Sequence, residues 1–248
     1  MFTTDIKRED VLGILMYIMT ENTETAKGMF EGLEHTAPHI TLHNEQFRYI
    51  PKGFRDRIAK AIVHFSAECA DFLFKERYSH RAVVLETIAS VPGMIGGFFQ
   101  HLKSLRFIRD DHGWIKTLLD EAENERMHLL IYSEIAHPNK IERLLIIIVQ
   151  LFFCIIYFLL YLISPRTAHR VVGYFEEEAI HSYEHFLHLV DSGTQENIPA
   201  TQLAIQYWNL SADATLSDMI RATIIDEMAH RDVNHRFAGD AYGTRMWR

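Results

Sequence analysis

The chain has 248 residues, of which 48% are hydrophobic, and its formal net charge is −8. This length and apolar content are sufficient for one sizeable core, and the negative charge disfavours nucleic acid as a general partner. Cys69 and Cys154 are not spaced as a C-x-x-C pair, so we expect both to be reduced packing residues. The first ten residues resemble neither a signal peptide nor a mitochondrial presequence, so we expect a bacterial chain or a processed form.

Few prolines and glycines, together with long periodic apolar stretches, predict an all-α fold. We expect an N-terminal arm over residues 1–43, with a short helix at 11–19, and a helical domain over 44–248. The domain's helices are predicted over 54–74, 81–106, 114–136, 141–163, 166–191, 199–210 and from 211 or 213 to 238. Pro92-Gly93 predicts a break or kink in the second helix, and Ser164-Pro165 predicts the start of the fifth.

One short pattern occurs twice inside predicted helices, as Glu125-Arg-Met-His128 and Glu227-Met-Ala-His230, each with a lone upstream glutamate on an apolar stripe. Positions three apart share a helix face, so the glutamate and the histidine of each pattern can reach one metal ion. Burying an isolated carboxylate is costly, whereas four carboxylates balance the charge of two Fe²⁺ ions. The pattern predicts a ferritin-like four-helix bundle with a di-iron core. Its predicted ligands are Glu86, Glu125, His128, Glu176, Glu227 and His230.

The same spacing also occurs at Glu134–His137 and at Glu178–His181, so spacing alone is a weak signal. Glu178 shares its stripe with histidines and Ser182, which predicts a position at the rim of the site. Glu134–His137 has apolar neighbours at a helix end, and periodicity alone leaves it open. Oxygen ligands with some imidazole suit iron or manganese, and the absence of thiolates disfavours structural zinc.

Residues 144–163 are apolar apart from Gln150, so their length and hydropathy make them a transmembrane candidate. The ligands before and after this helix must meet in one bundle, so we expect it to lie in the membrane surface rather than to span the bilayer. The basic residues expected to reach lipid headgroups from its two ends are Lys140, Arg143, Arg166 and Arg170. The basic, apolar-faced helix 54–74 is its expected partner, giving two extra helices that form a membrane-surface-binding face. The alternative is a soluble protein in which helix 141–163 is a core helix.

These residues resemble the alternative oxidases, which are membrane-bound di-iron quinol oxidases. The similarity rests on Arg81-Ala-Val-Val-Leu-Glu86-Thr, Val91-Pro-Gly-Met-Ile-Gly-Gly97, Glu123-Asn-Glu125-Arg-Met-His128-Leu, Phe175-Glu-Glu-Glu-Ala179 and Asp226-Glu-Met-Ala-His230. It implies a respiratory-chain ubiquinol:oxygen oxidoreductase that uses two iron ions, reduces dioxygen to water with four electrons and pumps no protons. It also implies a homodimer on the mitochondrial inner membrane (matrix face) or on the bacterial inner membrane (cytoplasmic face).

The resemblance also implies roles for further residues. Tyr183 is expected to supply an electron or a proton during O–O cleavage. The positions around the metal ligands are Asn124, Asp226, Tyr207 and Trp208, and the quinol-binding positions are Arg81, Leu85, Glu178, Ala179 and Ser182. Relatives often carry threonine where this chain has Ser182.

Two other classes of protein remain as alternatives. A ferritin-like iron-handling protein would oxidise Fe²⁺ without quinol, and the apolar helix 141–163 speaks against it. A non-enzymatic helical membrane scaffold would need no metal ligands, and the doubled Glu…Glu-x-x-His pattern speaks against that.

Overall fold

A computed structural model describes residues 48–74 and 77–240. The expected N-terminal arm over residues 1–43, with its helix at 11–19, lies outside these described residues. The chain divides into two units, and all described residues belong to the second, Glu45–Arg248. The described residues of the second unit are helical apart from loops and one isolated bridge between Pro199 and Thr215, which confirms the predicted all-α class.

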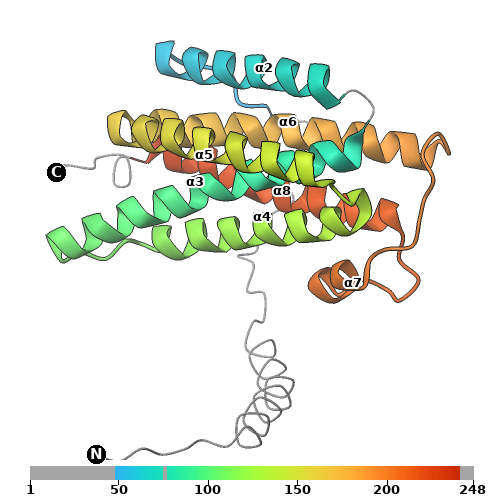
Figure 1. The fold of residues 1–248 in the computed structure, drawn as a ribbon. Coiled ribbons are helices and arrows are strands. Elements are labelled where there is room, and N and C mark those ends of the chain that lie inside the picture. The colour runs from blue at the N-terminus through green and yellow to red at the C-terminus, as the bar shows by residue number, and fades with distance from the viewer. Residues whose placement is uncertain (1–47, 75–76, 241–248) are drawn as a thin grey trace, which may run out of the picture. The chain divides into compact units, whose positions relative to one another are not determined.

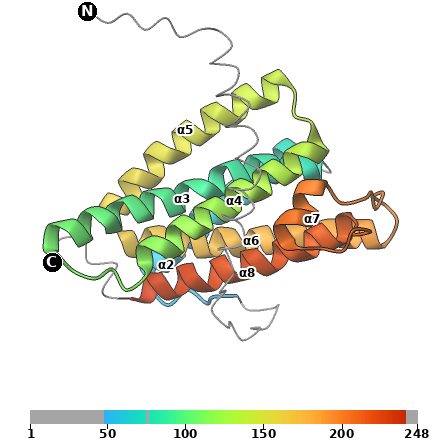
Figure 2. The ribbon, with the colours of Figure 1, turned by 90° about the horizontal axis from the view of Figure 1, so that it is seen from below.

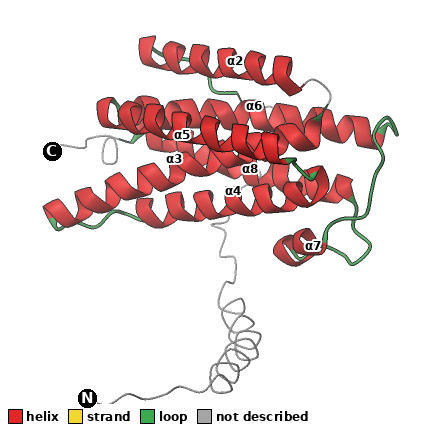
Figure 3. Ribbon diagram, viewed as in Figure 1, coloured by secondary structure: helices red, strands yellow, loops and turns green. Residues whose placement is uncertain are grey.

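Seven helices cover the described residues (Figure 1; Figure 3 shows the same view by secondary structure). They are α2 (Phe54–Phe74), α3 (Tyr78–Phe107), α4 (Trp114–Ala136), α5 (Lys140–Ile163), α6 (Pro165–Asp191), α7 (Gln202–Trp208) and α8 (Leu216–Gly239). Their starts follow from local chemistry. Asn139 and Glu142 form a capping box at the start of α5, and the Ser164 hydroxyl accepts from the Thr167 backbone N–H at the start of α6.

The structure corrects two predicted boundaries. α3 begins at Tyr78 rather than near Arg81, and it runs unbroken through Pro92 to Phe107, which excludes the break of the predicted break or kink. α8 begins at Leu216 rather than near Asp213, because Thr215 and Asp218 form a capping box there.

α3, α4, α6 and α8 form the bundle, and the contacts between them give their directions. Near the end of α8, Asn234 contacts His169, which lies near the start of α6, and Glu121, which lies early in α4. Closer to its own start, α8 contacts Asp191 at the end of α6 through Ser217, and it contacts Tyr132 late in α4 through Thr223. α4 and α6 therefore both run antiparallel to α8 and parallel to each other. α5 is the crossover between them, as the sequence predicts, and Figure 2 shows it at the edge of the bundle beyond α3.

Two glycines allow close helix packing, one in each antiparallel pair. A Cβ atom at Gly93 of α3 would lie 2.3 Å from the backbone oxygen of Leu118 in α4. A Cβ atom at Gly173 of α6 would lie 2.5 Å from the His235 ring in α8. The two pairs can approach this closely only because neither position carries a side chain.

α2 is attached to α6 by a buried polar network. The Arg170 guanidinium lies 3.4 Å from Asp56 of α2, and it donates to His235 Nδ1 at 2.8 Å. His235 Nε2–H therefore donates to Glu177 at 2.9 Å, and the Tyr49 backbone N–H donates to the same carboxylate at 2.6 Å. Arg170 is thus a buried partner of Asp56, and the expectation that it reaches lipid headgroups was wrong.

An apolar surface remains on the outside of the bundle. α5 has only two buried residues, Tyr157 and Tyr161, and exposes most of its leucine, isoleucine and phenylalanine side chains. α3 and α5 are both long and apolar enough to cross a membrane, but the apolar stretch of α3 is 61% buried and that of α5 only 11%. The alternative in which α5 is a core helix was wrong. Cys69 is exposed and Cys154 half-buried, so Cys69 was wrongly expected to be a packing residue.

Candidate metal centre

The six predicted ligands come together in the middle of the bundle, each at most 8% exposed. They form two overlapping groups whose candidate ligand atoms lie within 4.8 Å of one another. The first metal position is defined by Glu86, Glu125, His128 and Glu227, and the second metal position by Glu125, Glu176, Glu227 and His230. Both groups contain Glu125 and Glu227, so two ions held in them would share these two carboxylates.

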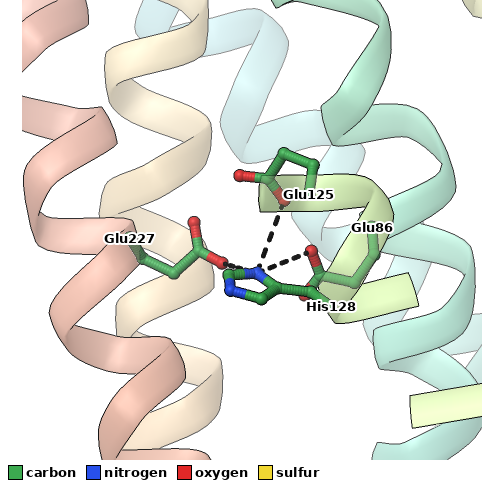
Figure 4. Close-up of side chains that lie close together, drawn as sticks. All are labelled: Glu86, Glu125, His128 and Glu227. Carbon is green, nitrogen blue, oxygen red and sulfur yellow. Dashed lines mark ion pairs between the residues drawn. The ribbon is translucent and has the colours of Figure 1, made fainter. Parts of the chain in front are cut away.

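Figure 4 shows the first metal position, with the His128 ring between three carboxylates. His128 Nδ1 lies 3.2 Å from Glu227, 3.5 Å from Glu86 and 3.8 Å from Glu125. At the second metal position, His230 Nδ1 lies 2.6 Å from Glu125 and 3.5 Å from Glu227. Both histidines therefore direct the same ring nitrogen into the carboxylate cluster.

Asp226 determines how His128 is oriented. One oxygen of this carboxylate accepts from His128 Nε2 at 3.1 Å, from Trp208 Nε1 at 2.8 Å and from the Asn124 amide at 3.0 Å. The Asn124 amide also donates to the Tyr207 hydroxyl at 2.6 Å. A carboxylate only accepts, so His128 Nε2 carries the proton, and a metal ion would be bound through Nδ1. The four positions that resemblance put around the ligands thus form one contiguous network.

The charges of the cluster are strongly coupled. Burial, together with the neighbouring carboxylates Glu125 and Glu227, raises the pKa of both Glu86 and Glu176 well above its usual range. Burial opposes ionisation of Glu125 too, but His230 and His128 hold the pKa of this carboxyl well below its usual value. The carboxylates around the histidines raise the pKa of both imidazoles despite their burial. In metal-free protein, protons on the histidines and glutamates therefore carry the positive charge that cations would supply.

The residues fit a pair of hard divalent cations. Five buried atoms that face the cluster have no hydrogen-bond partner: both oxygens of Glu125, Glu227 Oε2, and Nδ1 of His128 and of His230. Buried polar atoms normally make hydrogen bonds, so five such atoms without one in a single cluster of carboxylates and imidazoles fit a site for cations. Carboxylate oxygens with imidazole nitrogen, and no thiolate, suit iron or manganese.

Tyr183 of α6 contacts the first metal position, where its hydroxyl donates to Glu86. Burial and the charge of Glu86 raise the pKa of this phenol well above its usual range, so its proton is retained. The Tyr132 ring stacks near the Tyr183 ring, with centroids 5.4 Å apart, and its hydroxyl shares a hydrogen bond with Thr223 at 3.0 Å.

The remaining predicted residues divide by exposure. Glu134 and His137 are exposed at the end of α4, which excludes this alternative pair as a buried ligand set. The predicted quinol-binding residues are all half-buried, two on α3 and three on α6: Arg81, Leu85, Glu178, Ala179 and Ser182. Glu178 is thus wetter than its neighbour Glu176, and its role in binding quinol stays a prediction.

Sequence reasoning missed a second set of buried polar residues beside the cluster. Glu121 is 4% exposed, and both of its oxygens accept from the Asn234 amide, at 3.0 and 2.9 Å. Burial raises the pKa of Glu121 to about 7. Helical spacing could have found both residues, since Glu121 lies one turn before Glu125 and Asn234 one turn after His230.

A four-helix bundle whose core holds two Glu-x-x-His pairs and two further glutamates defines the carboxylate-bridged di-metal class of proteins. The comparison with protein families makes the assignment specific. The family model described as "Alternative oxidase" matches residues 40–239, and the chain belongs to this family.

Over the aligned residues, curated relatives are about half identical to this chain. It is 53% identical over 189 residues to "Ubiquinol oxidase, mitochondrial" of Batrachochytrium dendrobatidis, covering 76% of this chain and 60% of the relative. It is 54% identical over 194 residues to "Ubiquinol oxidase 1a, mitochondrial" of Arabidopsis thaliana, covering 78% and 54%. For the protein of the same name from Oryza sativa subsp. japonica the identity is 52% over 198 residues, covering 80% and 59%. The aligned part of the chain thus spans between half and two thirds of each of these relatives.

Proposed function

We propose that this protein is a ubiquinol:oxygen oxidoreductase of a respiratory chain, which oxidises ubiquinol and reduces dioxygen to water at a di-iron centre. The observation that carries the proposal is the pair of overlapping ligand groups that share Glu125 and Glu227, in a chain of the alternative oxidase family. The names of the relatives, each a ubiquinol oxidase, support the choice of substrate.

The overall reaction balances without an additional reductant. Two ubiquinols release four electrons and four protons, which together reduce one dioxygen to two waters. The pair of iron ions held by the six ligands would supply dioxygen binding and electron transfer. Because the proposed attachment is monotopic, the proposed reaction moves no protons across the bilayer.

The surrounding residues have separate roles in this proposal. Asp226 fixes the proton on Nε2 of His128 and leaves Nδ1 for the metal. Tyr183 holds a proton on the hydroxyl that it directs to Glu86, close to where the oxygen atoms react, and this phenol can give up a proton and an electron together. The cluster excludes bulk water because its ligands are almost fully buried.

Ubiquinol would reach the centre from the lipid. The exposed apolar residues of α5, such as Phe152 and Ile155, support a monotopic attachment, as do Phe54 and Phe65 on α2. Exposed Lys140, Arg143 and Arg166 flank the two ends of α5, where headgroups would lie. We place the quinol ring among Arg81, Leu85, Glu178, Ala179 and Ser182, which are half-buried on α3 and α6.

The cellular setting follows from the relatives. Their names place them in mitochondria, which supports attachment to a mitochondrial membrane. We propose the matrix face of the mitochondrial inner membrane or, in a bacterium, the cytoplasmic face of the inner membrane. A homodimer is part of the proposal.

Oxygen uptake by the purified protein, assayed for iron, tests the function when a short-chain ubiquinol is added. We expect about two irons per chain and rapid uptake, and we expect both to be lost in Glu227→Ala, which removes a bridging carboxylate. Iron without quinol-driven uptake would instead indicate a ferroxidase. Protein without iron would contradict the metal centre itself.

A further inference from the structure

α5, the helix whose apolar side chains are mostly exposed, extends only two buried side chains into the bundle, and both are tyrosines one turn apart. The Tyr157 hydroxyl has no hydrogen-bond partner. The Tyr161 hydroxyl instead contacts His169 Nε2 of α6 at 3.1 Å and accepts from the Gln100 amide of α3 at 3.1 Å. Tyr161 is therefore a buried polar connection between α5 and the interior of the bundle, in addition to the hydrogen bond that the Gln150 amide donates to the Thr87 backbone oxygen of α3.

The hydrogen bonds continue from Tyr161 through two helices to Glu121. His169 Nδ1 lies 3.0 Å from the side-chain oxygen of Asn234 in α8, and the Asn234 amide donates to both oxygens of Glu121 in α4. Tyr161, His169, Asn234 and Glu121 form what we call the Tyr161–Glu121 chain. All four residues are buried, and the chain crosses the bundle from α5 to α4.

The direction of each bond in this chain is determined. Asn234 uses its amide nitrogen on the carboxylate, so its oxygen accepts and His169 Nδ1 donates. His169 Nε2 must then accept, so the Tyr161 hydroxyl donates. Burial lowers the pKa of His169 to about 4, which agrees with a neutral ring of this tautomer. Every donor thus points toward Glu121.

The chain ends beside the second metal position. The Asn234 amide also donates to the backbone oxygen of His230 at 3.0 Å, so it contacts the helical turn that presents this ligand. The charge of Glu121 acts most strongly on His230 and also on Glu125 and Glu227, and Glu121 is one turn before Glu125. Asn234 therefore positions both a buried carboxylate and a ligand-bearing turn.

The first metal position has no equivalent chain among the described residues. Thr223 and Tyr132 occupy the positions that correspond to Glu121 and Asn234, four residues before the bridging glutamate and four after the histidine. They make a single hydrogen bond with each other at 3.0 Å. The two copies of the ligand pattern thus differ in the buried hydrogen bonds beside them.

We propose that Asn234 and His169 are positioning residues of the second metal position, and that the Tyr161–Glu121 chain connects this position to the lipid-exposed helix α5. The inference rests on the proposed metal centre. Asn234 sets Glu121 and the His230 turn against the bridging carboxylates, and His169 holds the Asn234 amide in the orientation that this requires. Loss of either residue weakens the second metal position and leaves the first intact.

Anaerobic titration of the chelator-treated full chain with Fe²⁺ tests this proposal. The parent should bind two ions, and Asn234→Leu should bind one ion with parental affinity and the second on the order of 10- to 100-fold more weakly. Thr223→Val is the matched control, because it removes the Thr223–Tyr132 hydrogen bond beside the first metal position. In this variant the second ion should bind with parental affinity. His169→Leu should resemble Asn234→Leu, whereas His169→Asn, whose amide can donate where Nδ1 does, should recover most of the affinity.

Nitrogen-15 NMR of His169 in the parent protein provides a readout that does not depend on variants folding. We expect a protonated Nδ1 and an unprotonated Nε2 at neutral pH. The reverse tautomer, or equal weakening of both ions in Asn234→Leu, would overturn the proposal. A parent that binds no metal would refute the proposed function instead, while the His169 signals would still test the hydrogen-bond chain.

Discussion

The two halves of the metal centre have the same ligand types but different surroundings. In the first half, Asp226 lies at the rim, its side chain 27% exposed, and fixes His128 directly. In the second half, no described carboxylate accepts from His230 Nε2, and support comes from Asn234 and Glu121 inside the bundle. The repeated pattern therefore specifies where ligands lie, while the residues one turn away decide how each ligand is held.

Removal of a bridging carboxylate should have the largest effect, because Glu227 belongs to both halves. We expect Glu227→Ala to weaken both ions by at least about 100-fold and to abolish oxygen uptake. Glu86→Ala removes a ligand from the first half alone, so one ion should remain bound. Iron analysis of the two variants distinguishes these results, and equal loss in both would contradict the assignment of Glu227 as a bridge.

Tyr183→Phe should impair chemistry in the first half without loss of metal. The phenol donates to Glu86, and without it a proton donor is missing at the reacting centre. We expect kcat to fall on the order of 10²-fold or more, with iron content unchanged. Tyr132→Phe is the matched control for loss of a nearby buried hydroxyl. A Tyr183→Phe enzyme with parental kcat would remove Tyr183 from the mechanism.

Glu121, in the second half, should make the metal-free protein less stable at neutral and alkaline pH than at acidic pH. Burial raises the pKa of Glu121 from its ordinary 4.5 to about 7, so its stabilising contribution is complete below about pH 4.5 and is lost as the pH rises to 7. A shift of this size corresponds to about 3 kcal/mol of unfolding free energy. Urea unfolding of chelator-treated protein at pH 4 and pH 8 measures the loss. Glu121→Gln, which cannot ionise, should reduce this loss by that amount, and an unchanged pH dependence would refute the assignment.

Asp226→Asn should have the smallest effect of the four. The amide keeps the shape of the side chain but cannot accept from His128, Trp208 and Asn124 as a carboxylate does. We expect the affinity of the first metal position to fall on the order of tenfold, while the second keeps its affinity. Stepwise Fe²⁺ titration measures both. Weakening of the second position alone would reverse the roles of the two halves.

Helical periodicity predicted most of the fold and the ligand cluster. The apolar stripes beside Glu86 and Glu176 identified which glutamates face inward, and this distinguished Glu176 from the half-buried Glu178. The crossover role of α5 followed because ligands on both sides of it had to meet. These inferences succeeded because each depends only on residues within one helix or on a requirement for the ligands to converge.

Contacts between distant helices could not be read from periodicity. The pairing of Asn234 with Glu121 joins residues 113 apart in sequence, and that of Arg170 with Asp56 joins two other helices. Arg170 is a basic residue near the start of α6, as expected of a residue that binds lipid headgroups, yet it is buried beside its partner Asp56 of α2. The role of such a polar residue depends on which helix packs against it. The pattern of residues within one helix does not show this.

The close contacts at Gly93 and Gly173 give the metal centre a sensitivity to remote mutation. Neither glycine is a ligand, yet each sets the separation of one antiparallel pair, and each pair carries half of the glutamates. A methyl group at either position would have to push two helix backbones or a buried ring apart, and the carboxylates on those helices would move with them. The distance between the two metal positions therefore depends on these helix contacts. A substitution outside the ligand cluster can disable the metal centre while every ligand is still present.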